Sequence, residues 1–208
     1  MSRGRRPAAP LVALVAAIAG LFGATQLTEG DFLRIGREAW RVIESFEQPQ
    51  ERRPARERPS GEPFSGHPRV IDGDTIDVAG IRVRMQGIDA LERDQQCNRR
   101  GGGRFACGEA AREALEELIA GREVTCTPDG SLTHGRTVAV CTVADTRGGM
   151  LDLNEGMVRS GLAFDCPRYS KGRYAEAEAA AKAAGEGAWA GRFTYPWTHR
   201  DRSGACGR

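Results

Sequence analysis

The stretch VIDGDTIDVAGIRVRMQGIDALE, residues 70–92, decides the fold because apolar and polar residues alternate along it. A period of two predicts half-buried β-strands, here at residues 69–71, 75–78 and 81–88. The Ala-Gly dipeptide at 79–80 predicts a tight turn between the last two strands. We therefore expect the folded part of the chain to open with a run of short strands.

The same stretch carries more charge than such strands usually do. Asp72, Asp74, Asp89 and Glu92 lie among its aliphatic residues, and Arg84 lies between the two acidic pairs. Residues two apart in an extended segment face the same side, so the first two carboxylates are expected together. Carboxylates gathered without histidine or cysteine suit a hard cation such as Ca²⁺, and they would repel one another without it.

Two arginines extend this pattern. Arg84 and Arg136 each lie on or beside a predicted strand, and a guanidinium group offers a planar fork that fits phosphate oxygens. A cation, two guanidinium groups and a free carboxylate are the parts that phosphodiester hydrolysis requires. Taken singly, each residue has a plainer interpretation as a turn, a solvated loop residue or an exposed strand residue.

The remainder of the folded part contributes two more strands and three helices. Strands are predicted at 123–127 and 137–143, and helices at 108–121, 152–161 and 172–187. The second helix opens with a capping-box pattern, an aspartate followed by a glutamate three residues later. Strands dominate the first half without regular β-α-β alternation, which favours a small α+β barrel over a doubly wound sheet.

The N-terminal third has a different composition. Arginines precede an apolar run, LVALVAAIAGLFGA, so residues 1–24 are either a cleaved signal peptide or an uncleaved membrane anchor. Residues 25–46 have the spacing of an amphipathic helix, which suits a membrane surface, a partner or a spacer. Residues 47–68 are rich in Pro, Arg and Glu and are expected to form a disordered linker. The protein is thus expected to be periplasmic or secreted, or anchored to the inner membrane.

Composition narrows the possible partners. The chain has 208 residues and a net charge of +2, and from Arg69 onward its acidic and basic residues balance. A neutral domain argues against strong adhesion to nucleic acid through net charge alone, so local arginines would have to supply it. No obligate protein partner is indicated.

The six cysteines of an exported chain predict disulfides rather than a zinc site. No Cys-x-x-Cys pair occurs, and the three histidines are far apart. One pair flanks two strands around a turn, a second brackets a glycine-rich loop, and the third remains by elimination. The favoured pairs are Cys126–Cys141, Cys97–Cys107 and Cys166–Cys206.

Four separated motifs resemble the staphylococcal nuclease (thermonuclease) family. They are VIDGDT, VRMQGIDALE, GRTVAV and DLNEGMVRSGLA, and the resemblance covers residues 69–193. It implies an OB-fold domain at about 69–195, a five-stranded β-barrel with three helices, followed by a tail at 196–208. It also implies Ca²⁺-dependent hydrolysis of DNA or RNA.

The resemblance assigns the metal site by position. Asp74 and Asp89 resemble the direct calcium ligands, joined by the backbone carbonyl of Ala90. Asp72 resembles the carboxylate that contacts the metal through water.

It likewise assigns the catalytic residues. Arg84 resembles the first phosphate-binding arginine and Arg136 the second, which stabilises charge on phosphorus. Glu92 resembles the carboxylate that orients or deprotonates the attacking water.

Several positions depart from the family pattern. Ala90-Leu91 replaces the family's Thr-Pro, and His134 replaces a tyrosine, so it is either a phosphate contact or a plain turn residue. The family's second substrate-binding tyrosine has no exact match, but Tyr169 and Tyr174 lie near its expected position. The loop at 97–107 carries three further arginines that either touch nucleic acid or are merely solvated: Arg99, Arg100 and Arg104.

Two functions other than a nuclease remain open. An OB-fold module that binds single-stranded nucleic acid without cleaving it would be expected to lack a carboxylate or an arginine of this set. An envelope-anchored interaction protein would depend instead on the residues before Arg69.

Overall fold

The computed structural model describes residues 61–146 and 148–207. All described residues belong to one compact unit within Arg53–Arg208. The predicted signal or anchor at 1–24, the helix at 25–46 and the linker up to residue 60 lie outside the described residues. None of the described helices has the length and hydropathy needed to cross a membrane.

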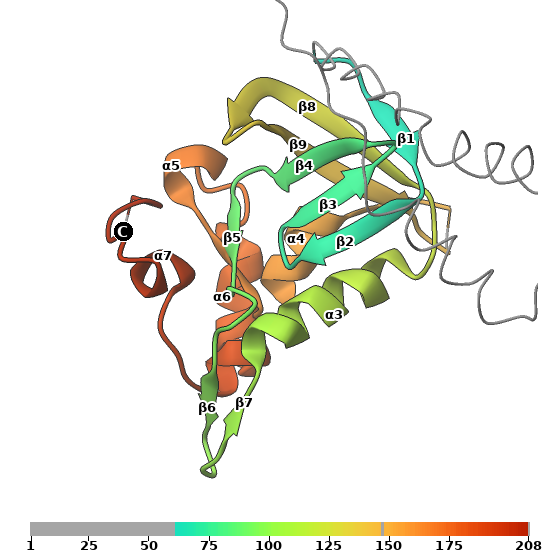
Figure 1. The fold of residues 1–208 in the computed structure, drawn as a ribbon. Helices are drawn as coiled ribbons and strands as arrows, with labels where there is room; N and C mark the ends of the chain where they lie inside the picture. Colours follow the sequence, from blue (N-terminus) through green and yellow to red (C-terminus); the bar gives the residue numbers. More distant parts are fainter. Residues whose placement is uncertain (1–60, 147, 208) are drawn as a thin grey trace, which may run out of the picture. The chain divides into compact units, whose positions relative to one another are not determined.

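The main sheet has seven strands among the described residues (Figure 1). Its order is β1-β8-β9-β4-β3-β2, and β10 pairs with β9. All pairs are antiparallel except β4 with β9. The strands are β1 Phe64–Gly66, β2 Pro68–Asp72, β3 Thr75–Val78, β4 Ile81–Met85, β8 Val124–Thr133, β9 Arg136–Ala144 and β10 Met150–Asp152.

The predicted hairpin between β3 and β4 is present. Ala79 and Gly80 form its two-residue turn, and both have a positive φ, as such hairpins favour. Inward-facing residues of both strands, such as Ile76 and Val83, are fully buried. On the outer face Asp77 lies opposite Arg82 and forms an ion pair with it. The alternation of apolar and polar residues therefore predicts correctly which side chains of β3 and β4 face the core and which face outward.

Two small sheets complete the strand pairing within residues 61–146 and 148–207. β5 Ile88–Ala90 pairs with β11 Ala163–Asp165. The other sheet contains β6 Cys97–Arg99, β7 Arg104–Phe105 and β12 Gly191–Arg192. Strands of two or three residues are too short to show a period, which is why the sequence does not reveal them.

The predicted α+β class is confirmed, whereas the numbers of strands and helices expected for the five-stranded barrel with three helices are wrong. The pairing path of the main sheet is open, with β1 and β2 at its two ends. The described residues form five α-helices and one 3₁₀ helix. These are α3 Cys107–Ile119, α4 Leu153–Arg159, α5 Pro167–Ser170, α6 Ala175–Ala184, η1 Gly187–Ala190 and α7 Pro196–His199.

Helix α4 fastens the sheet to the turn that precedes β5. Its N-cap Asp152 accepts a hydrogen bond from the backbone N–H of Glu155, as the capping pattern predicts. Asn154 is fully buried, and its side chain donates to the carbonyl of Gln86 and accepts from the N–H of Cys141. Because Gln86 lies just before β5, its hydrogen bond with Asn154 helps to fix where β5 begins.

The structure contains all three disulfides favoured by the sequence. Cys126 and Cys141 are directly opposite each other in the β8–β9 register. Cys97–Cys107 ties β6 to the first residue of α3, and Cys166–Cys206 ties the C-terminal residues to the start of α5.

Both ends of the predicted domain need correction. Residues 64–68, expected in the linker, form β1 and the first residue of β2, and β1 pairs with β8. At the other end, residues 196–207 are not a loose tail. They contain α7, the buried Trp197 and the disulfide-bonded Cys206.

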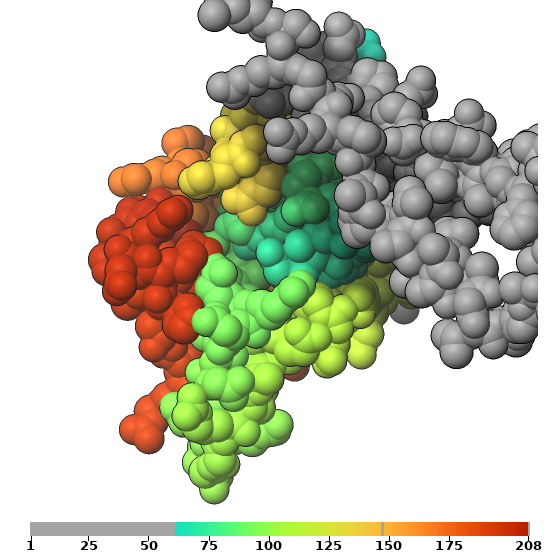
Figure 2. Space-filling view, in the orientation of Figure 1, coloured from blue at the N-terminus to red at the C-terminus, as the bar shows by residue number. Residues whose placement is uncertain are grey.

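An aromatic cluster packs the C-terminal residues against β11. The ring of Phe164 in β11 stacks on Phe193 and contacts three other rings, and Tyr195 stacks on Trp197 with a centroid distance of 4.5 Å. Burial of these large rings supplies the main apolar contact of this segment. Helix α7 is thereby placed beside β5 (Figures 1 and 2).

Replacing Gly108 with alanine is expected to destabilise the fold. A Cβ at Gly108 would lie 1.6 Å from the carbonyl oxygen of Glu92, so α3 or the loop after β5 would have to move. We expect a loss of about 1–3 kcal/mol in the free energy of unfolding, as is typical of overpacked sites. Denaturant unfolding measures it. Gly101→Ala is the control, because a Cβ there meets no atom within 4 Å, and equal losses in both variants would contradict the expectation.

Candidate active site

The Asp-Gly-Asp turn between β2 and β3 brings its carboxylates close to β5. A Cβ on Gly73 would lie 2.8 Å from the Cβ atoms of Ala90 and Ala111, so only glycine permits this approach. Asp72 accepts a hydrogen bond of 3.2 Å from the backbone N–H of Asp74. The turn is thus set directly against β5 and α3.

Asp74 and Asp89 are the two deeply buried carboxylates of the site, each 2% exposed. Oδ2 of Asp74 accepts a hydrogen bond of 2.8 Å from the backbone N–H of Ala90, and its Oδ1 accepts one of 3.1 Å from the Thr75 hydroxyl. Asp89 lies in β5 opposite Phe164 of β11. The pairing of β5 with β11 therefore holds Asp89 in place. The sequence predicts this residue just beyond the end of the strand at 81–88.

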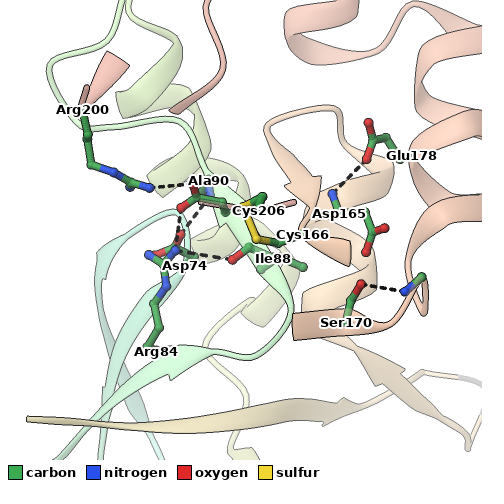
Figure 3. Close-up of a disulfide and its surroundings, with 12 residues drawn as sticks. Asp74, Arg84, Ile88, Ala90, Asp165, Cys166, Ser170, Glu178, Arg200 and Cys206 are labelled. Atoms are coloured by element: carbon green, nitrogen blue, oxygen red, sulfur yellow. Dashed lines mark hydrogen bonds and ion pairs between the residues drawn. A yellow bond between two sulfur atoms is a disulfide. The ribbon is translucent and has the colours of Figure 1, made fainter. Parts of the chain in front are cut away.

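Arg84 joins the two buried carboxylates. Its Nη1 donates to Oδ1 of Asp74, and its Nη2 donates to Oδ1 of Asp89 at 2.5 Å (Figure 3). Burial raises the pKa of Asp74; Arg84 opposes this, nearby Asp72 adds to it, and the net pKa is raised. Burial lowers the pKa of Arg84, but the charges of Asp74 and Asp89 outweigh it, and this pKa is also raised.

Arg136 reaches the same cluster through a hydroxyl. It is the first residue of β9, and its Nη1 donates a hydrogen bond of 3.3 Å to Oγ of Thr75, which in turn donates to Asp74. Burial and the neighbouring charge of Arg84 lower the pKa of Arg136. The structure therefore brings both predicted arginines to one buried carboxylate.

A third arginine, Arg200, enters the cluster from the C-terminal segment. Its Nη2 donates to Oδ2 of Asp89 at 2.6 Å, and its Nη1 pairs with Oε1 of Glu92. Burial lowers the pKa of Arg200, but the charges of Asp89 and Glu92 outweigh burial and raise it. Arg200 is absent from the site residues predicted from the sequence, because it lies in the predicted tail at 196–208. The available signal was Cys206, because its disulfide requires the segment to pack on the folded domain.

The other predicted contact residues lie outside this cluster. His134 is exposed in the β8–β9 turn with a φ of 49°, and Tyr169 is 57% exposed in α5. Arg99, Arg100 and Arg104 are exposed on the β6–β7 hairpin, which projects from the domain in Figure 1. No hydrogen bond or ion pair within residues 61–146 and 148–207 links these five to the buried carboxylates.

The donor types of the cluster fit a hard cation. Asp72, Asp74, Asp89 and the Ala90 carbonyl supply oxygen atoms alone, which is the ligand set that Ca²⁺ prefers. In the part of the chain that the structure describes, no three acidic, histidine or cysteine side chains are arranged to hold a metal as they stand. Guanidinium groups pair with these carboxylates instead, so the positive charge between them comes from arginine.

Removing Arg84 is expected to destabilise the protein in a pH-dependent way. Burial and Asp72 raise the pKa of Asp74, and the charge of Arg84 is the largest influence that lowers it. Without that charge, in Arg84→Gln, the pKa of Asp74 in the folded protein lies further above its value in the unfolded chain. A carboxyl group with a raised folded pKa destabilises the native state above its unfolded pKa, and the penalty falls as the pH drops towards that value. We expect a loss of about 3 kcal/mol at pH 7 and a clearly smaller one at pH 4.5.

Denaturant unfolding with chelator at both pH values measures this loss. Arg82→Gln is the control, because the Arg82 side chain is 44% exposed and pairs with Asp77 at the surface, and exposed pairs contribute little. A loss for Arg84→Gln that is the same at both pH values would contradict the expectation.

A protein-family model matches the part of the chain that carries most of this site. The family model described as "Staphylococcal nuclease homologue" matches residues 82–191, a range that contains Arg84, Asp89, Glu92 and Arg136. Asp72, Asp74 and Arg200 lie outside the matched range.

Three curated relatives are similar to the chain. The succinoglycan biosynthesis protein ExoI of Rhizobium meliloti (strain 1021) is 38% identical over 131 residues, which cover 62% of this chain and 66% of that protein. The micrococcal nuclease of Shigella flexneri is 35% identical over 111 residues, 50% of this chain and 58% of that protein. The protein ParB of Escherichia coli is 35% identical over 104 residues, 46% and 53% of the two chains.

The chain therefore spans just over half to about two thirds of the length of these relatives. The family match covers more than half of the chain itself, and it includes β4, β5 and the start of β9, which carry the clustered residues. The protein belongs to the staphylococcal nuclease family.

Proposed function

We propose that the protein is a Ca²⁺-dependent nuclease that hydrolyses phosphodiester bonds of DNA, RNA or both. One observation carries the proposal: Arg84 pairs with the buried carboxylates of both Asp74 and Asp89. Arg136 reaches Asp74 through the Thr75 hydroxyl, and the less buried carboxylate of Glu92 is joined to Asp89 through Arg200. Family membership and the similarity to a micrococcal nuclease support the same reaction.

The metal site in this proposal uses oxygen donors from two short segments. Asp74, Asp89 and the Ala90 carbonyl would hold Ca²⁺, and Asp72 would contact it through water. When bound, Ca²⁺ would neutralise negative charge on the phosphate and polarise its oxygens.

The side chains of the chain perform the remaining steps. Glu92 accepts a hydrogen bond from water, orients it toward phosphorus and takes its proton as the new P–O bond forms and the ester bond breaks. Arg84 and Arg136 bind the phosphoryl oxygens and stabilise the charge that builds on them. Arg136 suits this role because it reaches the cluster through the Thr75 hydroxyl, whereas Arg84 pairs directly with the two buried carboxylates.

Replacing Glu92 or Arg136 is expected to abolish most cleavage. Glu92→Gln removes the proton acceptor and Arg136→Ala removes a charge that acts in the transition state, so each should lower kcat about 10²–10³-fold. Release of acid-soluble fragments from single-stranded DNA and RNA, with Ca²⁺ or chelator, measures the rate.

Glu117→Gln is the matched control for this experiment, because Glu117 is exposed on the outer face of α3. Cleavage that persists at the wild-type rate in Glu92→Gln would overturn the role of this residue. Tight binding of nucleic acid by a folded wild-type protein, without cleavage in Ca²⁺, would favour a binding module instead.

The β6–β7 hairpin is our proposed contact for the nucleic-acid backbone beyond the scissile bond. Arg99, Arg100 and Arg104 are exposed there, and Arg99 lies over the ring of Phe105 at 4.9 Å. A hollow between this hairpin and β12 is lined by Arg99, Arg100 and Arg192 together with small or polar residues. Closely spaced guanidinium groups of this kind bind phosphates in sequence-independent fashion.

Replacing Arg99, Arg100 and Arg104 with glutamine is expected to weaken binding of long substrates. KM for a long single strand should rise about tenfold and its dependence on salt should flatten, because three phosphate contacts are lost. Cleavage of a dinucleotide should keep its rate, since it does not reach the hairpin. Steady-state kinetics at several salt concentrations test both statements. An unchanged KM for the long strand would contradict the proposal.

An oxidising compartment is the proposed location. Three disulfides join all six cysteines of the described domain, and such bonds persist mainly in exported proteins.

A further inference from the structure

Arg200 reaches the carboxylate cluster from a segment outside the residues that match the family model. It is the C-cap of α7, and its backbone N–H donates to the carbonyl of Pro196. Its side chain is 27% exposed, and its guanidinium spans Asp89 and Glu92. A residue contributed from outside the matched range thus touches two groups of the proposed reaction.

The segment that carries Arg200 is held firmly in place. Trp197 is 3% exposed and stacks on Tyr195, and Cys206 is bonded to Cys166. The backbone N–H of Arg202 donates to the carbonyl of Trp197 at 2.7 Å. Figure 2 shows the C-terminal residues packed directly against the region of β5. The position of Arg200 therefore follows from packing and does not depend on its ion pairs alone.

Arg200 occupies atoms that a cation would need. Both oxygens of Asp89 are engaged, Oδ1 by Arg84 and Oδ2 by Arg200. Both oxygens of Asp74 are engaged as well, by Arg84 and by the Ala90 N–H. Figure 3 shows Arg84 and Arg200 approaching this point from different elements. A divalent cation can bind these carboxylates only if guanidinium contacts are exchanged.

Of the two guanidinium groups, that of Arg200 is the easier to displace. Its Nε is buried and has no hydrogen-bond partner within the described residues, so its present position leaves one donor unsatisfied. Its side chain is also more exposed, at 27% against 19% for Arg84, which lies in a central strand of the main sheet.

We propose that Arg200 is an internal counterion that a divalent cation must displace from Asp89 and Glu92, and that it thereby sets the affinity of the site for the cation. The proposal rests on the cation site of the proposed function. Its physical basis is charge: Arg200 neutralises oxygens that would attract the cation, and it repels the cation directly. Removing Arg200 therefore strengthens cation binding, although it removes two ion pairs from the empty site.

The test measures binding of Ca²⁺ alone, without nucleic acid. Calorimetric titration of CaCl₂ into the full chain gives Kd for the wild type and for Arg200→Gln, Arg200→Lys and Arg202→Gln. We expect Arg200→Gln to bind about tenfold more tightly, a coupling of ordinary size for two ligands that compete at one site. Arg200→Lys should lie between, because an ammonium group cannot span both carboxylates as a fork does.

Arg202→Gln is the matched control. It removes the same charge from the same segment, and Arg202 is exposed. Its Kd should equal that of the wild type. Thermal unfolding of each variant shows whether it is folded before titration.

The outcomes separate this proposal from the nuclease proposal. Equal or weaker Ca²⁺ binding by folded Arg200→Gln overturns the counterion role, even if the wild type cleaves nucleic acid, and leaves Arg200 as a structural ion pair. Absence of binding in both proteins overturns it too. Tighter binding in Arg200→Gln supports the counterion role even if no variant cleaves nucleic acid, in which case only the nuclease proposal fails.

Discussion

The contact on which the rest of this domain depends is the one between Arg84 and the buried carboxylates of Asp74 and Asp89. Two carboxylates at such depth repel each other, and a charge left without a partner there would cost several kcal/mol. A positive charge between them offsets this cost. In this structure guanidinium groups supply that charge, and in the proposed enzyme a metal ion would share that role.

Much of the fold serves to bring these charges together and keep water largely away from them. Gly73 lets the turn after β2 approach β5, and Gly108 lets α3 approach the carbonyl of Glu92. Asn154 fixes the turn at Gln86 and forms hydrogen bonds to β9 as well. These residues perform no chemistry, yet each holds a segment that does. Changes at such positions are expected to affect activity through geometry.

How far the sequence alone predicts this structure depends on the range of the interactions involved. The strands around Ile76 and Val83, the cap at Asp152 and the pairing of Cys126 with Cys141 depend on neighbouring residues, and pattern and spacing predict them. β1 is different, because its three residues pair with a strand some sixty residues later and carry no period of their own. Arg200 was missed for a related reason: its contacts with Asp89 and Glu92 lie more than a hundred residues away in the chain.

The Cys166–Cys206 bond also makes the chain between these two cysteines a covalently closed loop. Protease cleavage at one exposed peptide bond between these cysteines, for instance after Lys171, would not release the part of the chain that carries Arg200. The two pieces would stay joined through sulfur, and the rings packed on Phe164 would still hold them together. A nicked protein of this kind would migrate as one species until a reductant separates it into two.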